Sequence, residues 1–232
     1  MKKSGFFAGI ILALTALPVF AVEPSDDRAS TKWLGPVLLD PEAHGIGKTV
    51  DDIRLGRLFG GFASLHAIAG NRGTVILVRD TDCPVSRAYG PRQADMARTY
   101  QRQGFNFIVV YLDDMTGLTS LARDAGGFDG PAAFITEGSE KLAQRLGVES
   151  TGDVFVLDAQ QRLRYRGAMD DQFGIGYTRD FPTRRLLDNA LRDLIAGREV
   201  AVPATTAPGC QVDADPNADR PLQGWNPQDR LS

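Results

Sequence analysis

The chain has 232 residues, of which 43% are hydrophobic and 24% charged, and its formal net charge is −3. These values are ordinary for a globular protein and leave no basic excess for nucleic acid, so we expect no nucleic-acid partner. The chain has 2 cysteines and 2 histidines, and their spacing matches no zinc motif. The composition therefore predicts no metal site and no other cofactor.

The N-terminus, residues 1–21, has the layout of a secretory signal peptide. Lys2 and Lys3 precede an apolar run, and cleavage is expected after Ala21. The apolar run is shorter than the roughly 20 residues that a membrane-spanning helix needs, which favours a cleaved signal over an anchor. We therefore expect a periplasmic or secreted protein with a bacterial, Sec-type signal and no stable membrane insertion after cleavage.

The next part of the chain leads from a polar segment into the first strands. Residues 22–32 are polar and indicate a flexible lead-in. Residues 52–58 alternate polar and apolar side chains, which is typical of a half-exposed strand. Residues 74–78 form a β-branched run bounded by glycine, as expected for a central strand that is buried on both faces.

A helix should follow this strand directly, over residues 84–102. Pro84 suits its first turn, where the missing N–H of proline costs nothing. Gly90-Pro91 should kink or restart the helix. The pattern then predicts a second central strand, a weak helix, a short edge strand and a short helix, over residues 105–112, 118–125, 131–136 and 140–146.

The last predicted elements are a hairpin and a helix. Residues 154–157 and 163–166 flank a turn and should pair as a strand–turn–strand unit. The final helix has one apolar stripe, ends before Gly197, and has Thr183 as its expected N-cap.

This order of elements predicts a single α/β domain. Residues 33–200 should form a central mixed sheet flanked by helices. Residues 201–232 are rich in Pro, Asp and Asn, and indicate an extended or disordered tail that carries Cys210.

Cys83 is the residue in the sequence with the clearest chemical meaning. It lies at a strand-to-helix junction, where unpaired helix N–H groups and the helix dipole favour negative charge. Because the thiolate is the reactive form, this position favours a low thiol pKa and a nucleophilic sulfur. Ser86 follows three residues later, and its hydroxyl could donate a hydrogen bond to the thiolate. The alternative is a buried, inert cysteine.

Several of these residues together resemble a known family. The run Thr81-Asp82-Cys83-Pro84-Val85-Ser86 after a central strand, with the late Pro208-Gly209-Cys210, resembles the redoxin, or peroxiredoxin-like, branch of the thioredoxin superfamily. The closest resemblance is to its group with Thr-Asp-Cys-Pro-x-Ser and a C-terminal Gly-Cys. The resemblance covers roughly residues 34–212. It implies a thioredoxin-like fold and a thiol-based redox role, with Cys83 as the attacking cysteine.

The same resemblance indicates which residues meet the substrate. We expect Thr81, Pro84, Arg87 and Gly152 to line the substrate site. Arg87 could orient a peroxide or another anion near Cys83, and the alternative is a solvated side chain at the surface. Gly152 is a departure from the family, because thioredoxin-like relatives carry a cis-proline at this position that shapes substrate docking. Asp80 is a second departure, since peroxiredoxins place Thr or Ser three residues before the attacking cysteine.

Cys210 is the natural partner of Cys83, because the segment after Gly197 is long enough to reach it. It is either a resolving cysteine or half of a permanent disulfide. In an oxidising compartment we expect the two cysteines to form an intramolecular disulfide.

Two classes of function remain open. The first is a thiol-based oxidoreductase, with Cys83 acting on a small peroxide or on the disulfides of a redox partner protein, and Cys210 resolving the product. The alternative is a non-enzymatic module for copper handling, redox sensing or partner binding. In that alternative Cys83 and His66 would suit Cu(I), or Cys83 and Cys210 would form a structural disulfide.

Overall fold

A computed structural model describes residues 35–112, 117–174 and 176–212. The expected signal peptide, the expected lead-in and the part of the expected tail beyond residue 212 lie outside these residues. Within the described ranges, no helix is both long enough and apolar enough to cross a membrane.

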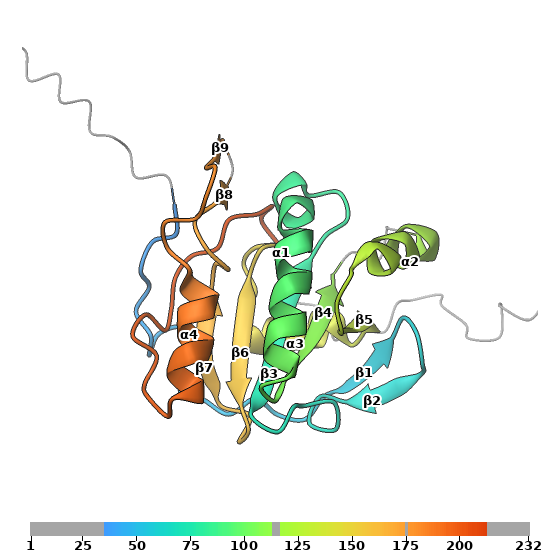
Figure 1. The fold of residues 1–232 in the computed structure, drawn as a ribbon. Helices are drawn as coiled ribbons and strands as arrows, with labels where there is room; N and C mark the ends of the chain where they lie inside the picture. The colour runs from blue at the N-terminus through green and yellow to red at the C-terminus, as the bar shows by residue number, and fades with distance from the viewer. Residues whose placement is uncertain (1–34, 113–116, 175, 213–232) are drawn as a thin grey trace, which may run out of the picture. The chain divides into compact units, whose positions relative to one another are not determined.

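Seven strands form one mixed sheet in the order β2-β1-β5-β4-β3-β6-β7 (Figure 1). Strands β3, β4 and β5 are parallel, β6 and β7 extend the sheet antiparallel on one side, and β1 and β2 do so on the other. In chain order the strands are β1 (Arg54–Arg57), β2 (Phe62–Ser64), β3 (Gly73–Arg79), β4 (Phe105–Tyr111), β5 (Ala133–Glu137), β6 (Val154–Asp158) and β7 (Leu163–Gly167).

The position of β5 differs from the sequence prediction of an edge strand. It lies between β4 and β1, because β1 pairs with its outer side. Whether a short strand lies at an edge depends on pairing with a segment far away in sequence, which its own residues do not encode.

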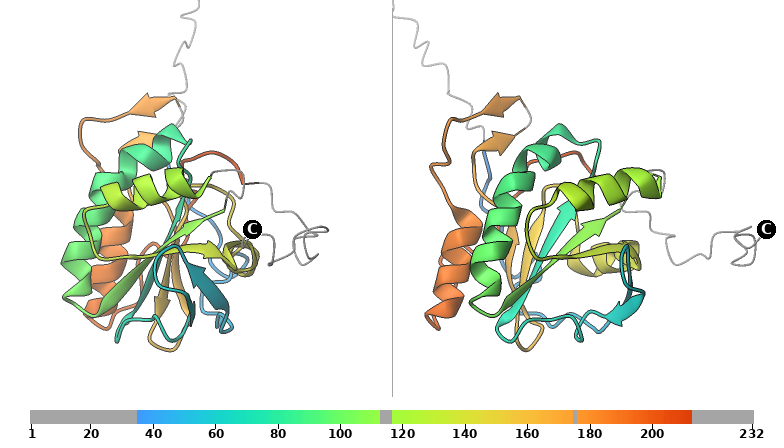
Figure 2. Two further views of the ribbon diagram at one scale, coloured as in Figure 1. Left: turned by 90° about the vertical axis from the view of Figure 1, so that its right-hand side faces the viewer. Right: turned by 45° about the vertical axis from the view of Figure 1, so that its right-hand side comes forward.

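Helices cover both faces of the sheet. Within the described residues they are α1 (Pro84–Gln101), α2 (Leu118–Gly127), α3 (Ser139–Leu146) and α4 (Leu186–Ile195). Helices α1, α2 and α4 pack on one face and α3 on the other, as Figure 2 shows from two further directions. All seven residues of β3 are buried, with Val75 and Leu77 facing one core and Ile76 and Val78 the other. Burial on both faces explains the β-branched run that predicted this strand.

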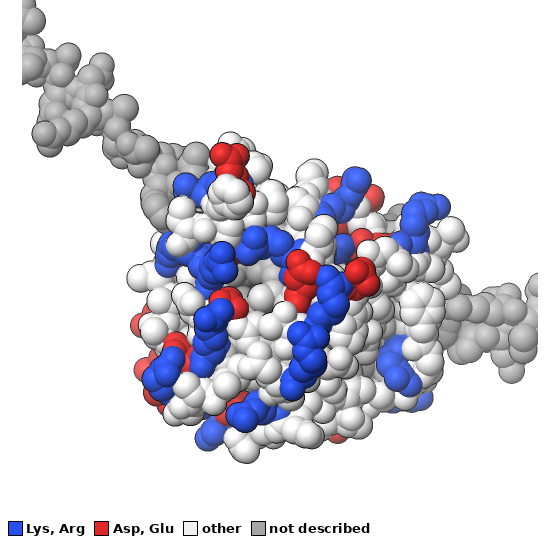
Figure 3. Space-filling model, in the orientation of Figure 1, with Lys and Arg blue, Asp and Glu red and all other residues white. Residues whose placement is uncertain are grey.

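Charged side chains are spread over the face formed by α1 and α4 (Figure 3). Ion pairs there include Arg98 with Asp129 and Arg192 with Asp188, each at 2.9 Å. Acidic neighbours therefore balance part of the positive charge locally.

Helix α1 is continuous through Gly90-Pro91, where the sequence predicted a kink or a restart. The buried guanidinium of Arg79 lies against Gly90 and donates from Nη1 to the Ser86 carbonyl at 3.3 Å. The carbonyl that Pro91 leaves without its helical N–H donor is that of Arg87, so the hydrogen bond from Arg79 to Ser86 adds to the helix ladder one residue earlier.

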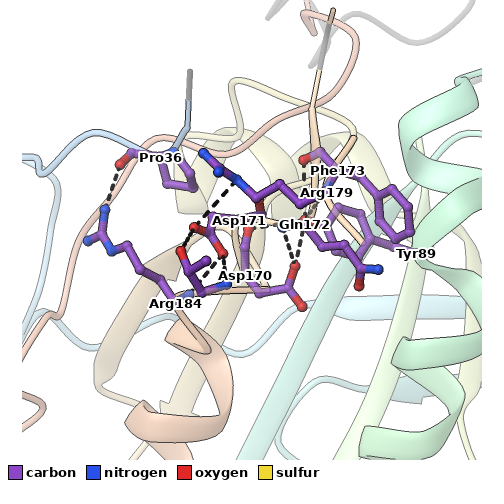
Figure 4. A network of polar contacts seen from close by, with 9 residues as sticks. Pro36, Tyr89, Asp170, Asp171, Gln172, Phe173, Arg179 and Arg184 are labelled. Carbon is purple, nitrogen blue, oxygen red and sulfur yellow. Dashed lines mark hydrogen bonds and ion pairs between the residues drawn. The ribbon is translucent and has the colours of Figure 1, made fainter. Parts of the chain in front are cut away.

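Helix α4 begins at Leu186 with Arg185 in the N-cap position, so the prediction of Thr183 as N-cap was wrong. The N–H of Thr183 donates to the buried Asp171 carboxylate at 2.7 Å, and its hydroxyl donates to the same group. Figure 4 shows Asp171 at the centre of this network. The threonine hydroxyl is therefore engaged by a residue that precedes it in the chain and does not cap the helix.

A short hairpin of β8 (Phe173–Gly174) and β9 (Tyr177–Thr178) was not predicted from the sequence. It packs against α1 through Tyr89, whose hydroxyl donates to Asp170 Oδ1 at 2.9 Å (Figure 4). The rings of Tyr89 and Phe173 meet edge to face, with centroids 5.1 Å apart.

The connections establish the fold class. A β3–α1–β4 unit is followed, after β5 and α3, by β6–β7–α4, and β4, β3, β6 and β7 are adjacent in that order. This is the arrangement of a thioredoxin-like fold, so the predicted fold class is confirmed.

Candidate active site

Cys83 lies where the sequence predicted it, directly after β3 at the N-cap of α1. Pro84 occupies the start of the helix, and the Arg87 N–H donates to the Cys83 carbonyl at 3.0 Å as the first helical bond. Cys83 is 1% exposed. The cysteine therefore combines a helix N-terminus, which favours a thiolate, with burial, which opposes one.

The described part of the expected tail is extended and packed against the domain. The Arg166 N–H of β7 donates to the Pro203 carbonyl at 2.9 Å, and the Thr205 N–H donates back to the Arg166 carbonyl at 3.1 Å. Two residues further on, the Ala168 N–H donates to the Thr205 hydroxyl at 3.1 Å. The tail thus runs along the outer edge of β7.

The last described residues of the tail, 208–212, pair with the loop that precedes β6. The Thr151 N–H donates to the Cys210 carbonyl at 2.9 Å, and the Cys210 N–H donates to the Thr151 hydroxyl at 3.0 Å. The Val212 N–H then donates to the Glu149 carbonyl at 3.0 Å. These bonds hold residues 208–212, which we call the tail strand, beside Cys83.

Gly152 is the point where the tail strand passes closest to the loop. A Cβ atom at this position would overlap the Pro208 carbonyl oxygen. Only glycine therefore fits beneath the tail strand. The space beside Gly152, where the sequence comparison expected a cis-proline in thioredoxin-like proteins, is filled by residues 208–209 of the tail strand.

The Cys83 and Cys210 thiols interact, and the pKa of each shifts. Burial is the largest single effect on Cys83 and acts to raise its pKa. Hydrogen bonds from the Cys210 thiol, the Thr151 hydroxyl and the Ser86 N–H outweigh burial, so the pKa is lowered overall. The same thiol–thiol hydrogen bond, with burial and the negative charges of Cys83 and Asp80, raises the pKa of Cys210 to about 11.

The disulfide that the sequence predicted is not formed, since Cys83 and Cys210 are both free thiols in the structure. The arrangement is that of a reduced pair, with a thiol of raised pKa donating to a sulfur of lowered pKa. Cys83 is buried and Cys210 is exposed. Cys210 is therefore the sulfur of the pair that faces solvent.

The other predicted site residues are distributed around this pair. The Ser86 hydroxyl accepts from the Asp80 N–H at 3.1 Å, while the Ser86 N–H points to Cys83. Thr81 is half-buried, and Pro84 and Arg87 are exposed. The Ser86 N–H thus helps to lower the pKa of Cys83, and donation from the Ser86 hydroxyl to the thiolate stays a prediction.

Thr151 is a site residue that sequence reasoning did not select. Its hydroxyl accepts from the Cys210 N–H and lowers the pKa of Cys83. The only signal for it in the sequence was its place beside Gly152, at the expected cis-proline position.

The buried carboxylate of Asp153 stabilises the loop that precedes β6. Asp153 is 2% exposed, and its Oδ2 accepts from the N–H groups of Glu149 at 2.8 Å and Ser150 at 3.0 Å. Burial raises the pKa of Asp153, and these N–H groups oppose the shift. The loop that receives the tail strand is therefore fixed by buried hydrogen bonds.

His66 does not lie near Cys83. Its N–H donates to the Asp52 carboxylate at 2.9 Å, and it lies just before Gly70, which pairs with Gly73 at the start of β3. Cys83 follows the other end of β3, about 20 Å away along a strand of this length. In the part of the chain that the structure describes, no group of three or more His, Cys, Asp and Glu residues is arranged to hold a metal ion.

No family model and no curated protein matches the sequence. Among solved structures, the chain is similar to an uncharacterized conserved protein from Geobacillus kaustophilus, with a TM-score of 0.61 and 20% identity over 75% of this chain and 94% of that one. It is also similar to the hypothetical protein SMc02350 from Sinorhizobium meliloti 1021, with a TM-score of 0.62 and 20% identity over 79% of this chain and 100% of that one. A match to the peroxidoxin BcpB from Mycobacterium tuberculosis has a TM-score of 0.48 and 18% identity, over 66% of this chain and 98% of that one. The first two likenesses extend over nearly the whole of those proteins and show a shared fold, which the strand order identifies as thioredoxin-like.

Proposed function

We propose that the protein is a thiol-based oxidoreductase, with Cys83 as the attacking thiolate and Cys210 as the resolving thiol. The observation that carries this proposal is the pairing of Thr151 with Cys210, which holds a second cysteine beside Cys83 at the N-terminal end of α1. The Thr151 N–H donates to the Cys210 carbonyl, and the Cys210 N–H donates to the Thr151 hydroxyl. An inert buried cysteine would require no second thiol held beside it.

The chemistry follows from this geometry. The Cys83 thiolate attacks one oxygen of a hydroperoxide, so that an S–O bond forms, the O–O bond breaks and an alcohol or water leaves with a proton. The Cys210 sulfur then attacks the resulting sulfenic acid, an S–S bond forms and water leaves. A dithiol reductant returns both cysteines to thiols by thiol–disulfide exchange. With a partner disulfide as the oxidant, Cys83 attacks a sulfur in place of an oxygen.

We also propose that the protein acts outside the cytoplasm. Two features support this: the signal-like residues 1–21, and a cysteine pair suited to an oxidising compartment.

The test uses the mature chain from residue 22, fully reduced and then treated with one equivalent of hydrogen peroxide or of a small disulfide. We expect wild-type protein to lose both thiols and to gain a Cys83–Cys210 crosslink without added oxygen. Cys210→Ser should stop at a sulfenic acid that a carbon nucleophile can trap. Equal reaction rates for Cys83→Ser and wild type, with both oxidants, would exclude the proposed function.

A further inference from the structure

The loop beside Cys83 already has an extended segment paired with it. Glu149 and Thr151 bond through their backbones to Val212 and Cys210. Ser150 and Gln211 form an antiparallel bridge between these pairs. The tail strand therefore occupies this edge in the way that an added peptide strand would.

The reactive sulfur is buried beside the loop on which the tail strand docks. Cys83 is 1% exposed, although it lies at the mouth of a helix N-terminus. The Pro208 carbonyl oxygen lies directly against Gly152, and Gly209 is buried there as well. The route by which an extended chain would reach Cys83 is therefore filled.

From this arrangement we infer that the docked tail strand restricts Cys83 to small oxidants of hydroperoxide size and excludes extended peptide disulfides. The inference rests on the proposed function and names the substrate class of the same site. A peptide that pairs with the loop needs the backbone groups of Thr151 and Glu149, which the tail strand uses. A hydroperoxide needs only a small local opening, which occurs far more often than release of a whole strand.

The two competing reactions differ in what leaves. With a hydroperoxide, the Cys83 sulfur gains an oxygen and the alcohol leaves, after which Cys210 displaces the oxygen as water. With a peptide disulfide, Cys83 forms a mixed disulfide and one peptide leaves as a thiolate. The second reaction requires room for two chains at a sulfur that is buried beside the loop on which the tail strand docks.

Gly152→Ala tests the inference with both cysteines in place. The added Cβ would overlap the Pro208 carbonyl, so the variant displaces the tail strand. Gly126→Ala is the matched control, since nothing lies within 4 Å of a Cβ at that position in α2. The measured quantity is the rate with a disulfide-linked pair of unstructured peptides, divided by the rate with hydrogen peroxide. We expect this ratio to rise about tenfold in Gly152→Ala and to stay at the wild-type value in Gly126→Ala.

A second pair of proteins gives the answer if Gly152→Ala does not fold. Cys210→Ser in the full mature chain is compared with a mature chain that ends at Ala207. Neither protein has a thiol at position 210, and the two differ because the shorter chain lacks residues 208–232. We expect the rate of mixed-disulfide formation with the peptide, divided by the rate with hydrogen peroxide, to be about tenfold higher in the shorter chain.

The outcomes separate the inference from the proposed function. If the presence of the tail strand makes no difference to the peptide rate, the inference is wrong and the oxidoreductase proposal stands. If Cys83 reacts with neither oxidant even in the shorter chain, both are wrong.

Discussion

Thr151 and Cys210 are joined by two hydrogen bonds, from the Thr151 N–H to the Cys210 carbonyl at 2.9 Å and from the Cys210 N–H to the Thr151 hydroxyl at 3.0 Å. The same hydroxyl lowers the pKa of Cys83. One threonine therefore fixes the position of the second cysteine and helps to stabilise the thiolate of the first.

Thr151→Val should raise the pKa of Cys83, because valine has the shape of threonine but no hydroxyl to donate. The pKa follows from the ultraviolet absorbance of the thiolate, or from the alkylation rate of Cys83, as a function of pH. Wild type should titrate below the unperturbed value of 9.0. Thr151→Ser restores a hydroxyl and should return the midpoint toward wild type. An identical midpoint in Thr151→Val would show that the hydroxyl does not stabilise the thiolate.

The contribution of the two thiols to the stability of the reduced protein should depend on pH, with a maximum near the pKa of an unfolded thiol. The folded pKa of Cys83 is lowered, so between that pKa and 9.0 the unfolded chain binds more protons and stability rises with pH. The folded pKa of Cys210 is raised from 9.0 to about 11, so in that interval the folded protein binds more protons and stability falls.

The check is the free energy of unfolding of reduced protein across this pH range, compared with a variant in which both cysteines are serine. Other titrating groups are common to both proteins and cancel in the difference. A difference that stays constant with pH would show that the two thiols do not share a proton in the folded state.

Asp171→Ala should destabilise the protein by roughly 2–4 kcal/mol, because it leaves buried donors without an acceptor. Asp171 is fully buried and accepts from the N–H groups of Thr183 at 2.7 Å and Arg184 at 2.8 Å. Denaturant unfolding measures the loss, and the exposed Asp180→Ala is the control. A loss no larger than that of the control would mean that water replaces the carboxylate.

Asp153→Ala should loosen the loop that receives the tail strand. Its Oδ2 accepts from the N–H groups of Glu149 and Ser150, which the alanine variant cannot do. We expect faster amide hydrogen exchange at Thr151 and Val212, while the core strand β3 keeps its protection. Asp153→Asn retains an acceptor oxygen and should lie between the two. Unchanged exchange at Thr151 in the alanine variant would show that the tail strand alone holds the loop.

Local patterns predicted most of the elements. The central strand β3, helix α1 after Pro84 and the β6–β7 hairpin all follow from residues that lie within the element itself. The incorrect predictions concern residues whose interaction partners lie elsewhere in the sequence. β5 is internal because β1 pairs with it, and Thr183 fails to cap α4 because it donates to Asp171.

The candidate site shows the same division. Cys83 at a helix start was predictable, because the proline that follows it marks the first turn. The docking of the tail strand was not, because its bonds to Thr151 and Glu149 are backbone bonds that leave no periodic pattern. Gly152 was noticed as a missing proline, whereas the structure shows a glycine that makes room for Pro208.

The place of the tail strand in the chain has a consequence for the order in which the protein matures. A chain is synthesised from its N-terminus, so the residues of the sheet and of α1 are all made before residues 208–212. During that interval we expect Cys83 to be open to exchange with thiols and disulfides that the docked tail strand would exclude. Docking of the tail strand ends this interval, so the newly made chain and the mature protein should differ in the molecules that can react with Cys83.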